Sequence, residues 1–286
     1  MKNVHFDFAD EAYKEVSKTI KKREETIKGI HSTWIEILKD DNTYQKKKGY
    51  YVSLEIQDMS LKSQVQLWSK KLENALKRIL KKHHYFKKKK VLIVGLGNAS
   101  YLSDALGPRV IQEIYATKHL IDHSIFSSLA PISAIDPGVT SKTGMETASI
   151  IQALVKKENF SFVIVIDSLA TMSIQRLYKV IQITDTGIEP GSGVQNHRLP
   201  ITKKSVGCPV ISIGVATVVE SAAFLYDMLQ KMQIEDISIQ EIREDLKKDK
   251  NNYIMTTKDI DKMIALLAKI ISRSLNACFN PELLED

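Results

Sequence analysis

Cysteine is scarce in this chain of 286 residues, where only Cys208 and Cys278 occur. Two cysteines cannot build the disulfide framework of a small secreted domain, and their spacing does not match a cysteine-based metal site. Neither cysteine lies in the sequence context of a catalytic nucleophile. We therefore expect a reducing, cytoplasmic location and no thiol chemistry.

Long apolar runs are also absent. No stretch approaches the roughly 18 apolar residues of a membrane-spanning helix. The N-terminal residues MKNVHFD contain no apolar signal-peptide core. The overall composition, 43% hydrophobic and 26% charged residues, is that of an ordinary globular protein. We expect no membrane partner.

Several common catalytic motifs are missing. The chain contains no G-x-S-x-G elbow for a serine nucleophile. His119 and His123 have helical i, i+4 spacing but belong to no H-E-x-x-H zinc motif. The turn Gly95-Leu96-Gly97 lacks the third glycine of a dinucleotide fingerprint, since residue 100 is serine. The sequence therefore gives little support to a serine hydrolase, a zinc metalloprotease of the H-E-x-x-H type or a dinucleotide-binding protein.

Basic residues exceed acidic ones, and the formal net charge is +7. Lysine runs at residues 21–23, 46–48, 81–82 and 87–90 concentrate this charge in the first 90 residues. No regular aromatic or arginine pattern is interleaved with them, so we expect a solvated surface and no direct nucleic-acid binding. Alternatively, a basic surface attracts nucleic acid or an acidic partner.

Apolar runs alternate with segments of helical spacing. Strands are predicted at 50–56, 91–94, 131–135, 162–166, 180–184 and 209–215, and helices at 61–80, 110–115, 148–155, 171–176, 217–232 and 259–278. This order predicts an α/β fold with a mostly parallel central sheet flanked by helices. We expect a single domain over 1–286, with helices at 12–28 and 33–38 in an N-terminal region of about 48 residues. The charged composition of residues 235–252 is typical of a linker.

Two aspartates follow buried strands. Asp104 lies shortly after the run V-L-I-V-G-L-G-N at 91–98, and Asp167 directly follows F-V-I-V-I at 162–166. Chemistry in open α/β sheets gathers outside the carboxyl ends of parallel strands. Two carboxyl groups sharing one crevice cannot both ionise cheaply, so the pair offers an acid and a base together. The alternative is that each aspartate caps the following helix.

Other residues leave alternatives open. Asp185 and the glycine-rich loop at 187–193 either bind substrate, with backbone N–H groups facing an oxyanion, or form a tight connection. His197 could join Asp104 and Asp167 in a metal site, or lie in a solvated loop. The glycine turn at 95–97 could cradle a phosphate in a non-enzymatic nucleotide-binding protein.

Several ordered motifs resemble those of the spore germination proteases. They are V-L-I-V-G-L-G-N at 91–98, D-A-L-G-P at 104–108, P-G-V at 137–139, T-G-M-E-T at 143–147, I-T-D-T-G-I-E-P-G-S-G-V at 183–194 and M-T-T-K-D-I-D at 255–261. The resemblance covers roughly residues 50–278. The region before Tyr50 fits poorly, and the segment 235–252 is shorter than the insertion usual in that family.

The resemblance implies an endopeptidase that initiates degradation of small acid-soluble spore proteins during germination. The family is assigned to the aspartic class on two aspartates, which correspond to Asp104 and Asp167. We expect no cofactor and assign substrate binding to six residues: Asn98, Glu146, Asp185, Gly187, Gly191 and Gly193.

The same resemblance implies further properties. Family members are homotetramers made as zymogens, and propeptide removal would fall after Asp7. The location would be the cytoplasm of the spore core. The fold is similar to that of hydrogenase maturation proteases, whose corresponding carboxylates bind nickel, so a metal-dependent maturation-type peptidase is an alternative.

Overall fold

The structure, a computed structural model, describes residues 7–13, 17–41, 44, 46–56, 62–191, 198–234, 236–248 and 253–284. Its centre is a mixed sheet with strand order β1-β2-β3-β7-β8-β6-β4-β5, and β9 pairs with β8. The strands are β1 (Ile20–Ile27), β2 (Ile30–Ile37), β3 (Gly49–Ile56), β4 (Val91–Gly95), β5 (Ile132–Ile135), β6 (Phe162–Thr171), β7 (Val180–Thr184), β8 (Val210–Glu220) and β9 (Ile254–Met255). The helices are α1 (Ala9–Ala12), α2 (Lys62–Lys82), α3 (Leu106–Gln112), α4 (Thr140–Thr143), α5 (Thr147–Glu158), α6 (Lys203–Val206), α7 (Ser221–Lys231), α8 (Ile239–Lys248) and α9 (Ile260–Phe279).

The α/β class is confirmed, but the prediction of a mostly parallel sheet is wrong in detail. The pairings β4–β5, β4–β6 and β6–β8 are parallel. The pairings β1–β2, β2–β3, β3–β7, β7–β8 and β8–β9 are antiparallel. The parallel half carries the apolar strands joined by helical crossovers, as such pairings require. The antiparallel half adds a meander at its edge.

The helices predicted at 12–28 and 33–38 are wrong, because this region forms the hairpin β1–β2. Ile27 pairs with Ile30 across a two-residue turn, in which Lys28 (φ 52°) and Gly29 (φ 76°) are both left-handed. The strand β1 is an edge strand of sequence IKKREETI. Its charged residues favour a helix by propensity, yet charge on an edge strand also protects it from pairing with other chains.

Three other boundaries differ from the prediction. The strand β6 continues to Thr171, and only a short 3-10 turn at Ile174–Arg176 follows where a helix was predicted. The strand β8 continues to Glu220, so the helix predicted from residue 217 begins at Ser221. The predicted linker at 235–252 contains α8. The remaining predicted strands and the helices at 61–80 and 259–278 are confirmed within a few residues.

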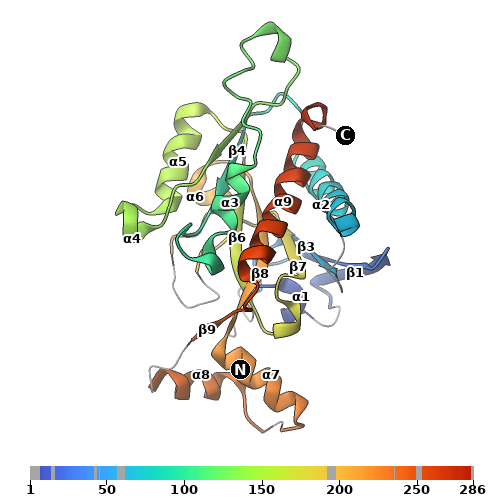
Figure 1. Cartoon of the computed structure of the whole chain (residues 1–286), viewed down its shortest axis with the longest axis vertical. Coiled ribbons are helices and arrows are strands. Elements are labelled where there is room, and N and C mark those ends of the chain that lie inside the picture. The colour runs from blue at the N-terminus through green and yellow to red at the C-terminus, as the bar shows by residue number, and fades with distance from the viewer. Residues whose placement is uncertain are drawn as a thin grey trace.

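Helices cover both faces of the sheet (Figure 1). On one face α2, α3 and α9 bury the largest core, in which Leu72 of α2 and Ile271 of α9 pack with Ile164 of β6. On the other face α5 and α6 pack on Val163, Val165 and Val210. Because neighbouring residues of a strand point to opposite faces, Asp167 shares the second face with Val163 and Val165.

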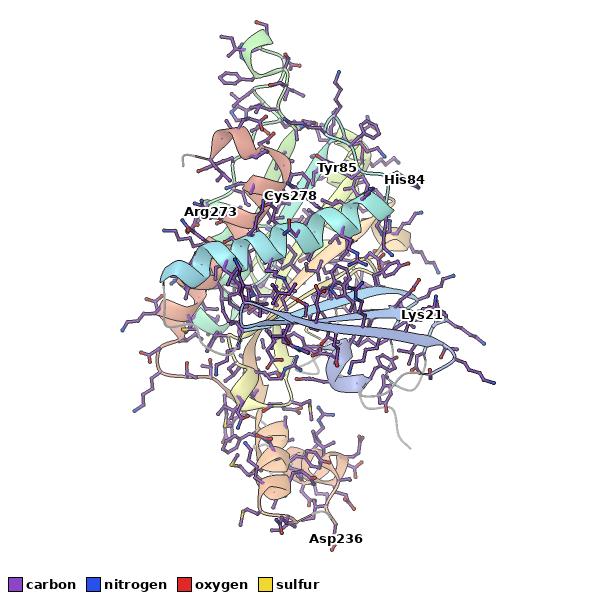
Figure 2. The ribbon with its side chains drawn as sticks, turned by 90° about the vertical axis from the view of Figure 1, so that its right-hand side faces the viewer. Lys21, His84, Tyr85, Asp236, Arg273 and Cys278 are labelled. Carbon is purple, nitrogen blue, oxygen red and sulfur yellow. The ribbon has the colours of Figure 1, made fainter. Side chains whose placement is uncertain are left out.

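The helices α7 and α8 project from the end of β8 as an arm (Figure 1). Figure 2 shows Asp236 at the far end of this arm and the long helix α2 crossing the sheet. Within the parts of the chain that the structure describes, no helix has both the length and the apolar character needed to cross a membrane.

Candidate active site

The turn after β4 is closed by tight backbone packing. Gly97 has a left-handed φ of 116°, and a Cβ atom there would overlap the carbonyl oxygen of Asp104. A Cβ atom on Gly107 would overlap the backbone of Leu96 in the same way. These glycines therefore let the chain fold back and hold Asp104 beside the end of β4. Their close contact is with the protein's own backbone, which does not support the phosphate-cradle reading of this turn.

Asp104 and Asp167 line one cavity of about 400 Å³. Asp104 ends the 3-10 turn Leu102–Asp104, and Asp167 lies within β6. Since β4 and β6 are parallel neighbours, their carboxyl ends meet at the same edge of the sheet. The structure thus brings the two aspartates together.

The pKa values of both carboxyl groups are raised above their ordinary values. Burial raises the pKa of Asp104 to about 6, although the nearby N–H of Asn98 opposes the shift. The pKa of Asp167 is raised well above its ordinary value, first by burial and then by the negative charge of Asp104. The N–H of Ser168, which donates to Asp167 Oδ1 (2.9 Å), offsets only part of this effect. At neutral pH the arrangement favours an ionised Asp104 beside a protonated Asp167.

Asn98 lies in the wall of the same cavity, and a lysine fixes its orientation. Its Oδ1 accepts hydrogen bonds from Lys142 Nζ (2.9 Å) and from the N–H of Ser100 (3.1 Å). The amide N–H₂ of Asn98 is therefore left to face other partners. Lys142 belongs to α4, and the sequence carried no signal that would have assigned it to the site.

Gly191 and Arg198 also line this cavity. Glu146, the residue before α5, forms a 3.8 Å ion pair with the guanidinium of Arg198. Glu146 therefore reaches the site through Arg198 and does not line the cavity itself. Arg198 was not predicted, because an arginine in a polar loop has no distinguishing pattern.

Asp185 does not line either of the cavities that contain other predicted residues. Its carboxylate accepts hydrogen bonds from the N–H of Tyr50 (2.7 Å) and pairs with Nε2 of His83 (2.8 Å). These contacts tie β3 and the end of α2 to the loop after β7. Gly187 lines a second, smaller cavity beside this loop.

Gly193 and His197 lie outside the described residues. Among the residues that the structure does describe, no cluster of three or more histidine, cysteine, aspartate or glutamate side chains is placed to hold a metal ion. The described residues therefore offer no ligand set for the metal alternative.

The second cavity, of about 80 Å³, is lined by Asp7, where propeptide removal was predicted, and by residues that the sequence did not single out, among them Lys46, Gln182, Ser212 and Gly214. Gln182 carried a usable signal, since it is a polar residue inside the buried strand V-I-Q-I-T and such residues need a partner. Lys46 carried none, because it lies in a run of lysines. Burial lowers the pKa of Lys46, while the charges of Asp7 and Glu11 raise it.

Comparison with known proteins places the chain in one family. The family model described as germination protease matches residues 2–234. The germination protease of Caldanaerobacter subterraneus subsp. tengcongensis is 36% identical over 92% of this chain and 89% of its own length. Those of Clostridium acetobutylicum and Clostridium tetani are 34% and 35% identical, each over 90% of this chain and 87% of their own length. The chain is therefore a peptidase that belongs to the germination protease family.

Proposed function

We propose that this peptidase is an endopeptidase of aspartic type that initiates the degradation of small acid-soluble spore proteins during germination. The observation that carries the proposal is the shared cavity of Asp104 and Asp167, where both pKa values are raised. A carboxyl pair of this kind can activate water and protonate a leaving amine without a covalent intermediate.

The two acids take different roles in this mechanism. Asp104, ionised above its pKa of about 6, accepts a proton from the attacking water, whose oxygen bonds to the carbonyl carbon of the substrate. Asp167, which keeps its proton, donates it to the amide nitrogen as the C–N bond breaks. One proton then returns from Asp104 to Asp167, which restores the pair for the next turnover.

Substrate binding is assigned to the groups around these acids. Asn98 and Gly191 contact the substrate directly, and their place in the cavity wall supports this role. Glu146 orients Arg198, while Asp185 and Gly187 shape the loop that borders the site. Gly193 keeps its predicted role in the same loop.

The chain is made as a zymogen whose propeptide ends at Asp7. The contacts of Asp7 support this proposal, because its Oδ2 accepts a hydrogen bond from the N–H of Ala170, three residues beyond Asp167 on β6. The charge of Asp7 also contributes to the raised pKa of Asp167. The carboxylate of Asp7 therefore lies near enough to Asp167 to act on it by charge.

The remaining assignments rest on the family resemblance. The enzyme is a single-domain homotetramer of the spore-core cytoplasm. Its lysine-rich surface draws in acidic protein substrates, and such steering weakens with added salt. A rate of substrate capture that stays constant from low to high salt would contradict the steering.

Cleavage of a purified small acid-soluble spore protein, with and without EDTA, tests the proposal. We expect internal cuts that persist in EDTA and that are lost in Asp104→Asn and in Asp167→Asn. Cleavage abolished by EDTA would instead identify a metal-dependent peptidase. If both variants cleaved the protein at the wild-type rate, the two aspartates would not carry the reaction.

A further inference from the structure

Residues 7–13 lie on the sheet face that carries Asp167. Phe8 is wholly buried there, packed against Leu169 of β6, Val180 of β7 and Ala216 of β8. The helix α1 follows directly, with Ala9 and Ala12 buried. This N-terminal segment therefore fills a groove across three strands of the sheet.

Gln182 holds the main chain on both sides of Phe8. Its Nε2 donates to the carbonyl oxygen of Asp7 (3.0 Å), and its Oε1 accepts from the N–H of Ala9 (2.7 Å). Both bonds go to backbone atoms, so they fix an extended peptide whatever its side chains are. Lys46 Nζ donates to the same carbonyl oxygen of Asp7 (2.9 Å).

The sheet register aligns Gln182 with Asp167. Gly214 of β8 pairs with Asp167 on one side and with Gln182 on the other. Residues paired in this way point to the same face, and adjacent strands lie about 4.8 Å apart. Asp167 and Gln182 therefore point to the same face of the sheet on either side of β8, with the side chain of Leu169 covering Gly214 between them.

Separate contacts anchor the segment further along. Asp10 pairs with Arg176 (2.5 Å) and accepts a hydrogen bond from Ser53 Oγ (2.7 Å). Glu11 pairs with Arg176 (2.8 Å) and accepts a hydrogen bond from Thr171 Oγ1 (2.5 Å). These contacts hold the chain after Phe8, which leaves Lys46 and Gln182 to hold the carbonyl before it.

We propose that Lys46 and Gln182 form a carbonyl clamp, which grips the carbonyl group of the peptide bond to be cut and is occupied in this structure by the chain's own Asp7. The clamp rests on the proposed function of the acid pair. Substrate peptides enter the same groove once the N-terminal segment has left it.

The clamp supplies what the acid pair lacks. When water adds to the carbonyl carbon, the carbonyl oxygen becomes negative, and hydrogen-bond donors already in place stabilise that charge. Lys46 Nζ and Gln182 Nε2 both lie at hydrogen-bond distance from this oxygen. Asp104 takes the proton from water as its oxygen bonds to the carbonyl carbon. The negatively charged oxygen then re-forms the C=O double bond as the C–N bond breaks. Asp167 gives its proton to the leaving nitrogen.

The test follows the full-length chain with a purified small acid-soluble spore protein added. Intact mass reports loss of residues 1–7, and product formation reports cleavage of the added protein. Lys46→Met should lower the rate constant of either reaction about 10²–10³-fold, as removal of an oxyanion donor does, mainly through kcat. Lys46→Arg should restore part of it. The matched control is Lys157→Met, because the Lys157 side chain is exposed and lies outside the lysine runs of the first 90 residues; its rates should not change.

Gln182→Leu provides an independent variant and should lower kcat/KM more than tenfold. A Lys46→Met chain with a wild-type unfolding curve and rates within twofold of wild type overturns the clamp. If Lys46→Met does not fold, unchanged kcat/KM in Gln182→Leu overturns it instead. Full activity in Asp104→Asn and Asp167→Asn contradicts the acid pair and leaves the result for Lys46 to be read separately. A wild-type chain that cuts neither itself nor the added protein contradicts both.

Discussion

Asp104 and Asp167 enter one cavity from different elements, and the negative charge of Asp104 raises the pKa of Asp167. Like charges in a buried site cannot both form cheaply, so one proton stays between the two groups. Burial decides which acid keeps the proton, because Asp167 is the more deeply buried acid and its pKa has the larger upward shift. The roles of base and acid follow from that difference.

The rate should depend on pH in a bell-shaped manner. Activity needs Asp104 ionised, so kcat/KM should rise with a midpoint near pH 6, the pKa to which burial raises this group. It should fall at higher pH as Asp167 loses its proton. Initial rates across the pH range, at constant ionic strength, measure both limbs. An acid limb centred near pH 4 would show that Asp104 is not the base.

Asp104→Asn should stabilise the folded chain at neutral pH. The pKa of Asp104 rises from 3.8 to about 6 on folding. Between these values the folded state binds more protons than the unfolded state, so its stability falls as pH rises. Two pKa units correspond to about 3 kcal/mol. Urea unfolding should therefore show a gain of roughly that size at pH 7.5 and a smaller gain at pH 4.5. An equal gain at both pH values would contradict the shift.

The positions of the two aspartates could be predicted from the sequence, because each follows an apolar run rich in β-branched residues. Their pairing required only that β4 and β6 be parallel neighbours. The strands β7 and β8 could also be predicted from their apolar runs. Local patterns of this kind succeed where burial alone decides the conformation.

The N-terminal half of the site could not be predicted in the same way. The strand β1 has the charged composition of a helix, and only its pairing with β2 makes it a strand. Lys46 and Gln182 gain their roles from residues 7–9, over 35 positions away in the chain. Contacts at such separation leave no periodic trace in a single sequence.

Gly97→Ala should disrupt the site through backbone packing. An added Cβ would overlap the carbonyl oxygen of Asp104, and the left-handed φ of 116° adds strain. Overpacking and strain together should lower the free energy of unfolding by about 2–5 kcal/mol. Most of the activity should be lost as well. Thermal unfolding and kcat measure the two effects.

Gly29→Ala is the matched control for Gly97→Ala. Gly29 is also left-handed, but a Cβ there would meet nothing within 4 Å. The control should cost only about 1–2 kcal/mol and leave kcat unchanged. Equal losses in both variants would show that the contact with Asp104 does not matter.

Arg176→Met should destabilise the chain and free the N-terminal segment. Arg176 pairs with Asp10, Glu11 and Glu55, and its side chain is only 14% exposed. Its removal leaves the buried carboxylates of Asp10 and Glu11 without their cationic partner, a change that costs about 3–5 kcal/mol. Chemical unfolding measures the loss, and limited proteolysis within residues 7–13 reports release of the segment.

Arg109→Met is the control for Arg176→Met. Its partner Asp261 is 65% exposed, so breaking this pair should cost less than about 1 kcal/mol. Proteolysis of residues 7–13 should stay at the wild-type rate in the control. If Arg176→Met behaved like Arg109→Met, the ion cluster would not be what holds the segment.

The most direct test of the acid pair is the kcat/KM of Asp104→Asn, Asp167→Asn and the double variant on one small acid-soluble spore protein. Groups that act as a unit lose their effect together, so each single change should lower kcat/KM at least about 10³-fold. The double variant should then be little worse than either single variant. Losses that multiply in the double variant, or a single variant within tenfold of wild type, would contradict catalysis by a coupled pair of aspartates.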